Sequence, residues 1–254
     1  MVHAKYAAMR ERSVGLGVMG FHSFLQDRGV PFEGVMAKVW NRKIFKHIRA
    51  QADAASVMLA EERGSNPDAA ECGITERFTH KMAIAPTASI SIIAGCTSPG
   101  IEPISANVFL QKTLSGSVTV KNRALKRVLA SHGRDDDKTW QSITLNKGSV
   151  QHLDFLTQTE RDVFKTAFEL DQRWIIEHAA DRQEFVCQGQ SVNLFLPANI
   201  HKRDLHEIHM MAWRKGLKGL YYCRSLSVQR AEAIGVAADN VKPKYEVTEC
   251  LACE

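Results

Sequence analysis

Residues 80–93 read HKMAIAPTASISII, with an apolar run on each side of a turn made of Pro, Thr, Ala and Ser. The run before Pro86 predicts a short buried strand, because a short apolar run that ends at a turn signal is typical of one. Pro is favoured in the first turn of a helix and Ser or Thr at its cap, so the turn predicts a helix start. The stretch therefore predicts a strand, a loop and a helix in succession.

Helices are predicted on both sides of this unit. Apolar residues recur near helical spacing over residues 35–62, which predicts one long amphipathic helix. Residues 119–139 predict a helix followed by a polar loop. Capping-box spacing at residues 157–160 predicts a helix that reaches His178, and the same spacing at residues 204–207 predicts a last helix.

Two further strands are predicted in the second half of the chain. Residues 191–196 read SVNLFL and alternate before a Pro, and residues 217–223 read LKGLYYC, with aromatic residues that favour strands. Strands therefore alternate with helices along the sequence. This order predicts an α/β fold with largely parallel strands.

Composition excludes several classes of protein. The 254 residues can bury a sizeable core, and 44% hydrophobic with 24% charged residues argue against a disordered or fibrous chain. There is no run of about 18 apolar residues and no apolar signal-peptide core, so neither a membrane span nor a secretory leader is expected. The net charge of +5 is spread over interleaved residues, so direct nucleic-acid binding is not expected. Four of the six cysteines stand singly, which favours a reducing, cytoplasmic setting.

Two motifs suggest cofactors but lack the context that such sites need. Gly15, Gly17 and Gly20 match G-x-G-x-x-G, yet charged residues precede them where a dinucleotide-binding fold needs an apolar strand. We expect these glycines to permit close helix packing, with a nicotinamide-dependent dehydrogenase as the alternative. His206 and His209 stand three residues apart, whereas the zinc motif H-E-x-x-H needs four. No metal site is predicted.

The chain ends in Cys250-Leu-Ala-Cys253 followed by Glu254. A thioredoxin-like motif needs a helix after it, which one residue cannot form. Three interpretations stay open at this point: a zinc ligand pair shared with a partner, an incidental pair, and a redox dithiol on a flexible arm. The 27 residues after Cys223 would span roughly 30 Å as a flexible coil, enough to reach a buried site and an external reductant.

Two more segments have an ordinary structural explanation beside a functional one. Tyr221 and Tyr222 suit packing in a strand, and as neighbours in a regular strand they would point to opposite faces. A functional pair would therefore need a local bend. Residues 86–91 suit helix capping, and a helix start with hydroxyl groups also suits an anion.

Together these segments resemble the large subunit of class I ribonucleotide reductase, in the right order through nearly the whole chain. The segments that carry the resemblance are RSVGLGVMGF (12–21), AEERG (60–64), IAPTASISII (84–93), SPGIEP (98–103), DRQEFVCQGQSVNLFLP (181–197), WRKGLKGLYYCRS (213–225) and the terminal C-x-x-C.

The resemblance implies roles for nine residues. The substrate diphosphate would lie on the loop formed by Pro86, Thr87, Ala88, Ser89 and Ile90. Tyr221 and Tyr222 match the pair that relays a radical from the small subunit, and they favour class I over the cobalamin-dependent class. Cys250 and Cys253 match the tail dithiol that reduces the active-site disulfide and is restored by thioredoxin or glutaredoxin. No cofactor is expected on this chain, because the radical comes from the metal-containing small subunit.

The sequence also departs from the family in ways that are informative. The family needs a thiyl-forming cysteine in an Asn-x-Cys-x-Glu segment and a cysteine pair that reduces the ribose, and this sequence has no such segment. Cys72, Cys96 and Cys187 match none of these motifs. The resemblance implies that residues 1–224 form the second half of a ten-stranded α/β barrel and that residues 225–254 form a mobile tail.

We therefore expect a split ribonucleoside-diphosphate reductase that makes deoxyribonucleotides by a radical mechanism. A separate N-terminal chain would supply the thiyl cysteine, the cysteine pair and the effector sites. A fragment of a longer chain explains the same sequence, and a non-catalytic assembly or regulatory remnant of the family is the alternative function.

Overall fold

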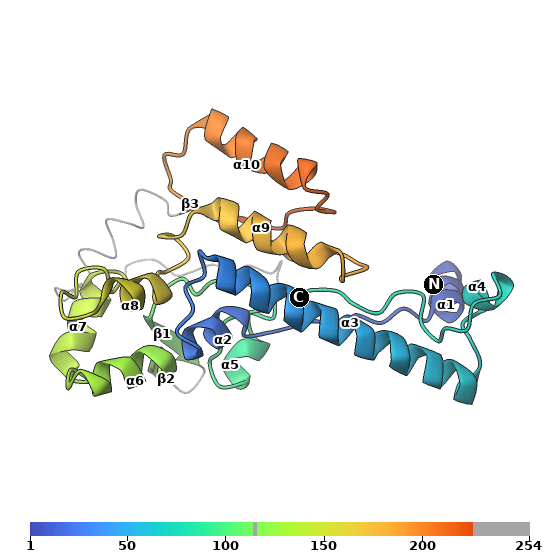
Figure 1. Cartoon of the computed structure of the whole chain (residues 1–254), viewed down its shortest axis with the longest axis horizontal. Coiled ribbons are helices and arrows are strands. Elements are labelled where there is room, and N and C mark those ends of the chain that lie inside the picture. Colours follow the sequence, from blue (N-terminus) through green and yellow to red (C-terminus); the bar gives the residue numbers. More distant parts are fainter. Residues whose placement is uncertain (114–115, 226–254) are drawn as a thin grey trace.

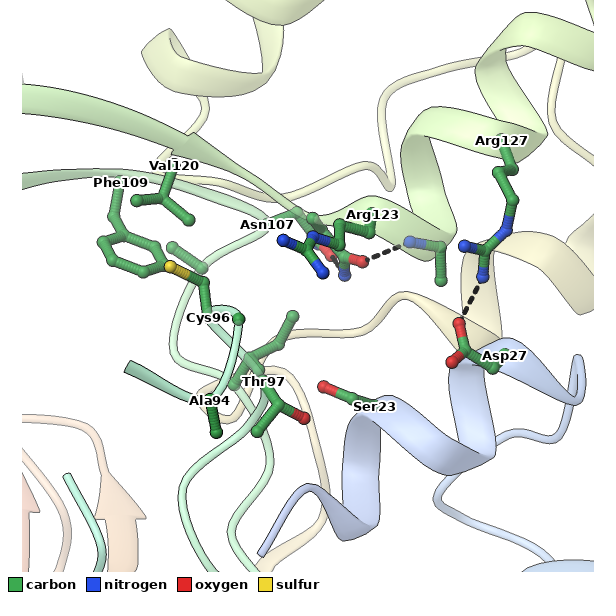
Figure 2. Close-up of a pocket in the computed structure, with 15 residues that line it drawn as sticks. Ser23, Asp27, Ala94, Cys96, Thr97, Asn107, Phe109, Val120, Arg123 and Arg127 are labelled. Carbon is green, nitrogen blue, oxygen red and sulfur yellow. Dashed lines mark hydrogen bonds and ion pairs between the residues drawn. The ribbon is translucent and has the colours of Figure 1, made fainter. Parts of the chain in front are cut away.

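The computed structural model describes residues 1–113 and 116–225 (Figure 1). The helices are α1 (Val2–Glu11), α2 (Phe21–Asp27), α3 (Val35–Arg63), α4 (Pro67–Glu71), α5 (Ile90–Ile93), α6 (Arg123–Ser131), α7 (Asp137–Leu145), α8 (Gln158–Val163), α9 (Gln172–Gln183) and α10 (Lys202–Arg214). The strands are β1 (Val108–Thr113), β2 (Gly116–Lys121), β3 (Leu194–Leu196) and β4 (Cys223–Ser225). In this part of the chain no helix is both long and apolar enough to cross a membrane.

Short parallel segments form one array that follows the chain order. Leu16 bridges Met82, Ile84 bridges Gln190, and β3 pairs with β4, all in parallel. The predicted strand before Pro86 is therefore confirmed as a short bridging segment, with Met82 and Ile84 buried. The α/β prediction is confirmed, and this array is parallel as expected.

Three helices pack on one another in succession. In Figure 1, α3 runs along the long axis of the molecule, α9 lies on α3, and α10 lies on α9. The predicted long helix is confirmed as α3. A buried polar cluster joins α3 to α9: Arg182 Nε donates to Asn41 Oδ1 at 3.0 Å, and Asn41 Nδ2 donates to the His178 carbonyl at 2.8 Å. Burial lowers the pKa of Arg182 to about 9.

The helix predicted from residue 119 is wrong at its start. Residues 116–121 form β2, which pairs antiparallel with β1 in register Val108 with Lys121. The helix α6 begins later, at Arg123, because Asn122 caps it through its side chain. A hairpin strand depends on its partner, and no periodicity of residues 119–121 alone reveals that partner.

Two helix starts were predicted from capping boxes, and one is right. The box at Thr157 and Glu160 is present at the start of α8. The helix does not continue to His178, because α8 ends at Val163 and α9 starts anew after Asp171. The box at residues 204–207 is wrong: His201 caps α10, and Glu207 binds Arg203 instead.

The glycine motif permits close packing at Gly17, but the neighbour is an extended backbone segment and not the predicted helix. A Cβ atom at this position would lie 2.5 Å from the Ala83 carbonyl oxygen, closer than atoms can approach. Gly17 therefore lets the segment at residues 14–17 lie against the strand that leads into Pro86. The motif serves backbone contact, and its last glycine, Gly20, is the N-cap residue of α2.

Replacing Gly17 with Ala should destabilise the chain. The added methyl group must displace the backbone at Ala83, and overpacking of this kind costs about 1–3 kcal/mol. Urea unfolding would measure the loss. Gly189→Ala is the matched control, because nothing lies within 4 Å of its added Cβ. Equal stability of the two variants would contradict the close approach.

Candidate active site

A cavity of about 630 Å³ opens at the carboxyl ends of the parallel array, a volume that suits a small-molecule ligand. Its walls come from residues 86–92, from residues 96–106, and from Phe195 and β4. Ligand sites of open α/β sheets commonly lie at this edge, because the loops that follow parallel strands meet there. The cavity is therefore the candidate active site.

The loop after Pro86 is tied to the neighbouring loop through one side chain. Thr87 adopts a left-handed backbone conformation, with φ of 52°, and its Oγ1 accepts a hydrogen bond from Gly100 N–H at 2.7 Å. Gly100 also has positive φ, and a Cβ there would lie 2.9 Å from the Ala85 carbonyl oxygen. The contact holds the two loops in one arrangement at the cavity.

The predicted helix start after this turn is confirmed, because the four-residue helix α5 begins at Ile90 with Ser89 at its N-cap position. The predicted capping interaction is wrong: Ser89 makes no capping hydrogen bond through its side chain, and Pro86 lies four residues before the first helical residue. The loop is held by Thr87 instead. Of the residues expected to bind the substrate diphosphate, Pro86 and Ala88 line the cavity directly. Ser89 and Ile90 are exposed beside it.

The two tyrosine rings lie against each other. Their centroids are 4.2 Å apart and their planes meet at 56°. The strand predicted over residues 217–223 is wrong in extent, because β4 starts at Cys223 and the pair precedes it. Tyr221 N–H donates to the Val192 carbonyl at 2.9 Å, and Tyr222 N–H donates to Asn193 Oδ1 at 2.8 Å. Two consecutive N–H groups thus point toward the same neighbouring segment, at residues 192–193. A regular strand does not allow this, so the backbone bends locally here, as a functional pair requires.

Sequence reasoning missed two residues of this site. Glu102 is buried on the wall of the cavity, with 6% of its surface exposed, and accepts a hydrogen bond from Asn193 Nδ2. Burial raises the pKa of Glu102 to about 7, against the opposing effect of Arg224. The signal was present, since both residues lie in segments that carry the family resemblance, SPGIEP and SVNLFL.

The two remaining predicted site residues, Cys250 and Cys253, lie outside the described residues, as does nearly all of the predicted tail. Cys96 and Cys223 line the cavity although no role was predicted for them. Within residues 1–113 and 116–225, no group of three His, Cys, Asp or Glu side chains is placed to hold a metal ion.

A parallel α/β layer with a ligand-sized cavity beside paired tyrosines defines an α/β protein with an enzyme-like site. The sequence matches the family described as ribonucleotide reductase, barrel domain, over residues 1–70 and 67–223. The chain therefore belongs to the ribonucleotide reductase large-subunit family, as the resemblance indicated.

Individual relatives agree with this assignment. The chain is 48% identical over 232 residues to the ribonucleoside-diphosphate reductase large subunit of Invertebrate iridescent virus 6, which covers 90% of this chain and 24% of that protein. It is 41% identical over 254 residues to the large subunit of Invertebrate iridescent virus 3, of which it spans 40%. The structure matches the Actinobacillus ureae class Id ribonucleotide reductase alpha subunit with a TM-score of 0.81 and 37% identity, over 89% of this chain and 41% of that one. The chain thus spans well under half the length of these relatives.

The stability of the chain should depend on pH through Glu102. Its pKa in the folded chain lies above that of an unfolded Glu, so this carboxyl favours folding most at low pH and loses that contribution as pH rises toward and through about 7. Glu102→Gln cannot ionise. The unfolding free energy of the variant minus that of the native chain should therefore increase by about 2 kcal/mol from pH 5.5 to pH 8.

Urea titrations at both pH values would measure this difference. Glu33→Gln, a change in a partly buried carboxyl away from the cavity, controls for loss of charge in general. If Glu102→Gln and the native chain differ in unfolding free energy by the same amount at both pH values, burial of the Glu102 carboxyl is contradicted.

Proposed function

We propose that this chain is part of a ribonucleoside-diphosphate reductase and provides its substrate-phosphate loop and its radical-relay tyrosines. The observation that carries the proposal is the cavity between residues 86–92 and β4. The strand β4 directly follows the two tyrosines whose rings are in contact. Family membership supplies the reaction, reduction of a ribonucleotide to a deoxyribonucleotide. The whole reaction needs more chain than the 254 residues present.

The loop has donors available for a diphosphate. The backbone amides of Ala88, Ser89 and Ile90 have no hydrogen-bond partner among the described residues, and they are consecutive. Thr87 Oγ1 accepts from Gly100, so its hydroxyl hydrogen stays available to donate. Consecutive free N–H groups suit phosphate oxygens. The single turn of α5 adds little dipole, so the amides and hydroxyls supply the binding.

The tyrosine pair suits transfer of a radical. Rings with centroids 4.2 Å apart are in contact, so an electron crosses between them without an intervening group. Oxidation of a phenol releases its proton, and both rings are about half exposed, at 51% for Tyr221 and 44% for Tyr222, which leaves room for proton exchange. The metal-containing small subunit would supply the oxidising equivalent, and this chain needs no cofactor of its own.

The missing parts would come from elsewhere in the large subunit. Among the described residues, the segment at 14–17 pairs only with residues 80–83, and β4 pairs only with β3. Two open strand edges in a parallel array are typical of an incomplete sheet. We propose that residues 1–224 are the second half of a barrel, and that the N-terminal part of the subunit pairs with these edges and carries the thiyl cysteine and the ribose-reducing cysteine pair.

Reconstitution tests this proposal. This chain, an N-terminal large-subunit segment of the same family and a radical-containing small subunit should reduce ribonucleoside diphosphates only when all three are mixed. Tyr221→Phe and Tyr222→Phe should each abolish turnover, because the phenol proton is removed, while binding of the other chains persists. The deoxyribonucleotide product would be measured by chromatography.

Retained turnover in either Phe variant would contradict the relay. Assembly of the native chain without any turnover would favour the non-catalytic remnant. Tyr6→Phe, on α1 and far from the cavity, is the matched control and should keep full activity.

The tail dithiol makes a separate prediction. Cys250→Ser and Cys253→Ser should lose turnover with thioredoxin or glutaredoxin and keep it with a small dithiol, because a small reductant reaches the active-site disulfide directly. Turnover with each reductant would be compared in the reconstituted mixture. Cys72→Ser is the control, since Cys72 is exposed at the end of α4. Loss with both reductants would contradict a shuttle role.

A further inference from the structure

The bend before β4 is bound by the backbone of the neighbouring strand and by the side chain of Asn193. Tyr221 N–H donates to the Val192 carbonyl, and Leu194 N–H donates to the Tyr222 carbonyl at 2.9 Å. In a regular parallel ladder both bonds would belong to a single residue opposite Asn193, so Tyr221 and Tyr222 form a bulge with one inserted residue. Here Tyr222 N–H also points toward that strand and donates to Asn193 Oδ1 at 2.8 Å. Asn193 supplies an acceptor that the regular ladder lacks.

This extra hydrogen bond decides where the rings lie. Side chains of consecutive residues alternate faces only while the backbone alternates. With two consecutive amides on one side, Tyr221 and Tyr222 bring their rings together, with centroids 4.2 Å apart. The side chain of Asn193 thus stabilises the backbone conformation on which ring contact depends.

A second residue orients the Asn193 amide. Asn193 is fully buried, and its Nδ2 donates to Glu102 Oε1. An ionised carboxylate only accepts hydrogen bonds, so it selects the orientation that turns Nδ2 toward Glu102 and Oδ1 toward Tyr222 N–H. Gly100, two residues before Glu102, binds Thr87 in the proposed phosphate loop. A chain of hydrogen bonds and short backbone steps therefore joins that loop to the tyrosines.

The charges around Glu102 come from several elements. Arg224 on β4 attracts the Glu102 carboxyl and lies 5.7 Å from the centre of the Tyr222 ring. The thiols of Cys223 and Cys96 line the same cavity. On the side of α2, His22 Nδ1 accepts from the Ile104 amide, and burial lowers the pKa of His22 to about 3, so it is neutral.

We infer that Asn193, oriented by Glu102, is the positioning residue that bends the chain at Tyr222 and holds the two tyrosine rings in contact. The role of Asn193 in turnover rests on the proposed radical relay, whereas its role in positioning the rings rests on the hydrogen bonds alone. Asn193 itself does not touch the substrate.

Swapping the amide of residue 193 and the carboxyl of residue 102 tests the inference. In Asn193→Asp the new carboxylate still accepts from Tyr222 N–H, but at pH 8 it faces the Glu102 carboxylate and repels it. At pH 5.5 Glu102 is protonated and can donate to the new Asp. In the double variant Asn193→Asp with Glu102→Gln, the Gln amide donates to the Asp carboxylate at both pH values, so the arrangement is restored with reversed polarity.

The measurement is hydrogen exchange of the Tyr222 amide in the full chain labelled with ¹⁵N-tyrosine. The chain has four tyrosines, and Tyr→Phe variants assign the signals. Relative to the native chain at the same pH, Asn193→Ala should speed exchange about tenfold, as expected for loss of one buried hydrogen bond. Asn193→Asp should match the native chain at pH 5.5 and exchange about tenfold faster at pH 8.

The double variant should match the native rate at both pH values, a rescue that a general packing defect would not produce. The Tyr6 amide on α1 is the internal reference, and Asn146→Asp, at the end of α7, is the control variant. Unchanged exchange in Asn193→Ala, or no rescue by the double variant when circular dichroism shows it folded, would overturn the inference.

Turnover separates this inference from the proposed function. In the reconstituted mixture Asn193→Asp should lower kcat at pH 8 with KM for the diphosphate unchanged, and the double variant should restore kcat. If the exchange pattern holds and the native chain never turns over, the positioning stands and the proposed function fails. If the native chain turns over and the exchange pattern is absent, the positioning fails and the proposed function stands.

Discussion

Backbone pairing between parallel segments is the interaction on which the rest of the structure depends. Leu16 with Met82, Ile84 with Gln190, and β3 with β4 are short contacts, but all run in one direction. Because the strands are parallel, the residues that follow them reach the same edge. The loop after Pro86 comes to that edge from one segment, and β4 lies beside it. Gly17 contributes by letting two of these backbones approach within a distance that no side chain allows.

Beside the cavity, the structure departs from the regular ladder. A regular strand would place Tyr221 and Tyr222 on opposite faces, whereas here their rings are in contact. The side-chain oxygen of the buried Asn193 accepts a hydrogen bond from Tyr222 N–H. This bond offsets the cost of leaving that donor unpaired. The neighbouring carboxyl of Glu102 is itself buried, and this burial raises its pKa to about 7. The wall of the cavity thus contains buried polar groups that the core must accommodate.

Elements with strong local signals were predictable. The long helix α3 has apolar residues at helical spacing over its whole length, and the capping box at Thr157 is a local pattern, so both were right. The hairpin of β1 and β2 was missed because each strand is stabilised by the other. The cap of α10 was assigned to the wrong residue because His201 accepts through a ring nitrogen, which no capping pattern of hydroxyl or carboxylate residues includes.

The sequence by itself determined the family and located the loop after Pro86 and the tyrosine pair, because these are runs of neighbouring residues whose order is the signal. Only the tertiary structure decided that the tyrosine rings touch, that Thr87 ties two loops together, and that Glu102 and Asn193 belong to the same site. These contacts join residues up to 91 positions apart in the chain. Their energies come from burial and hydrogen-bond geometry, which exist only once the parallel array has brought the segments together.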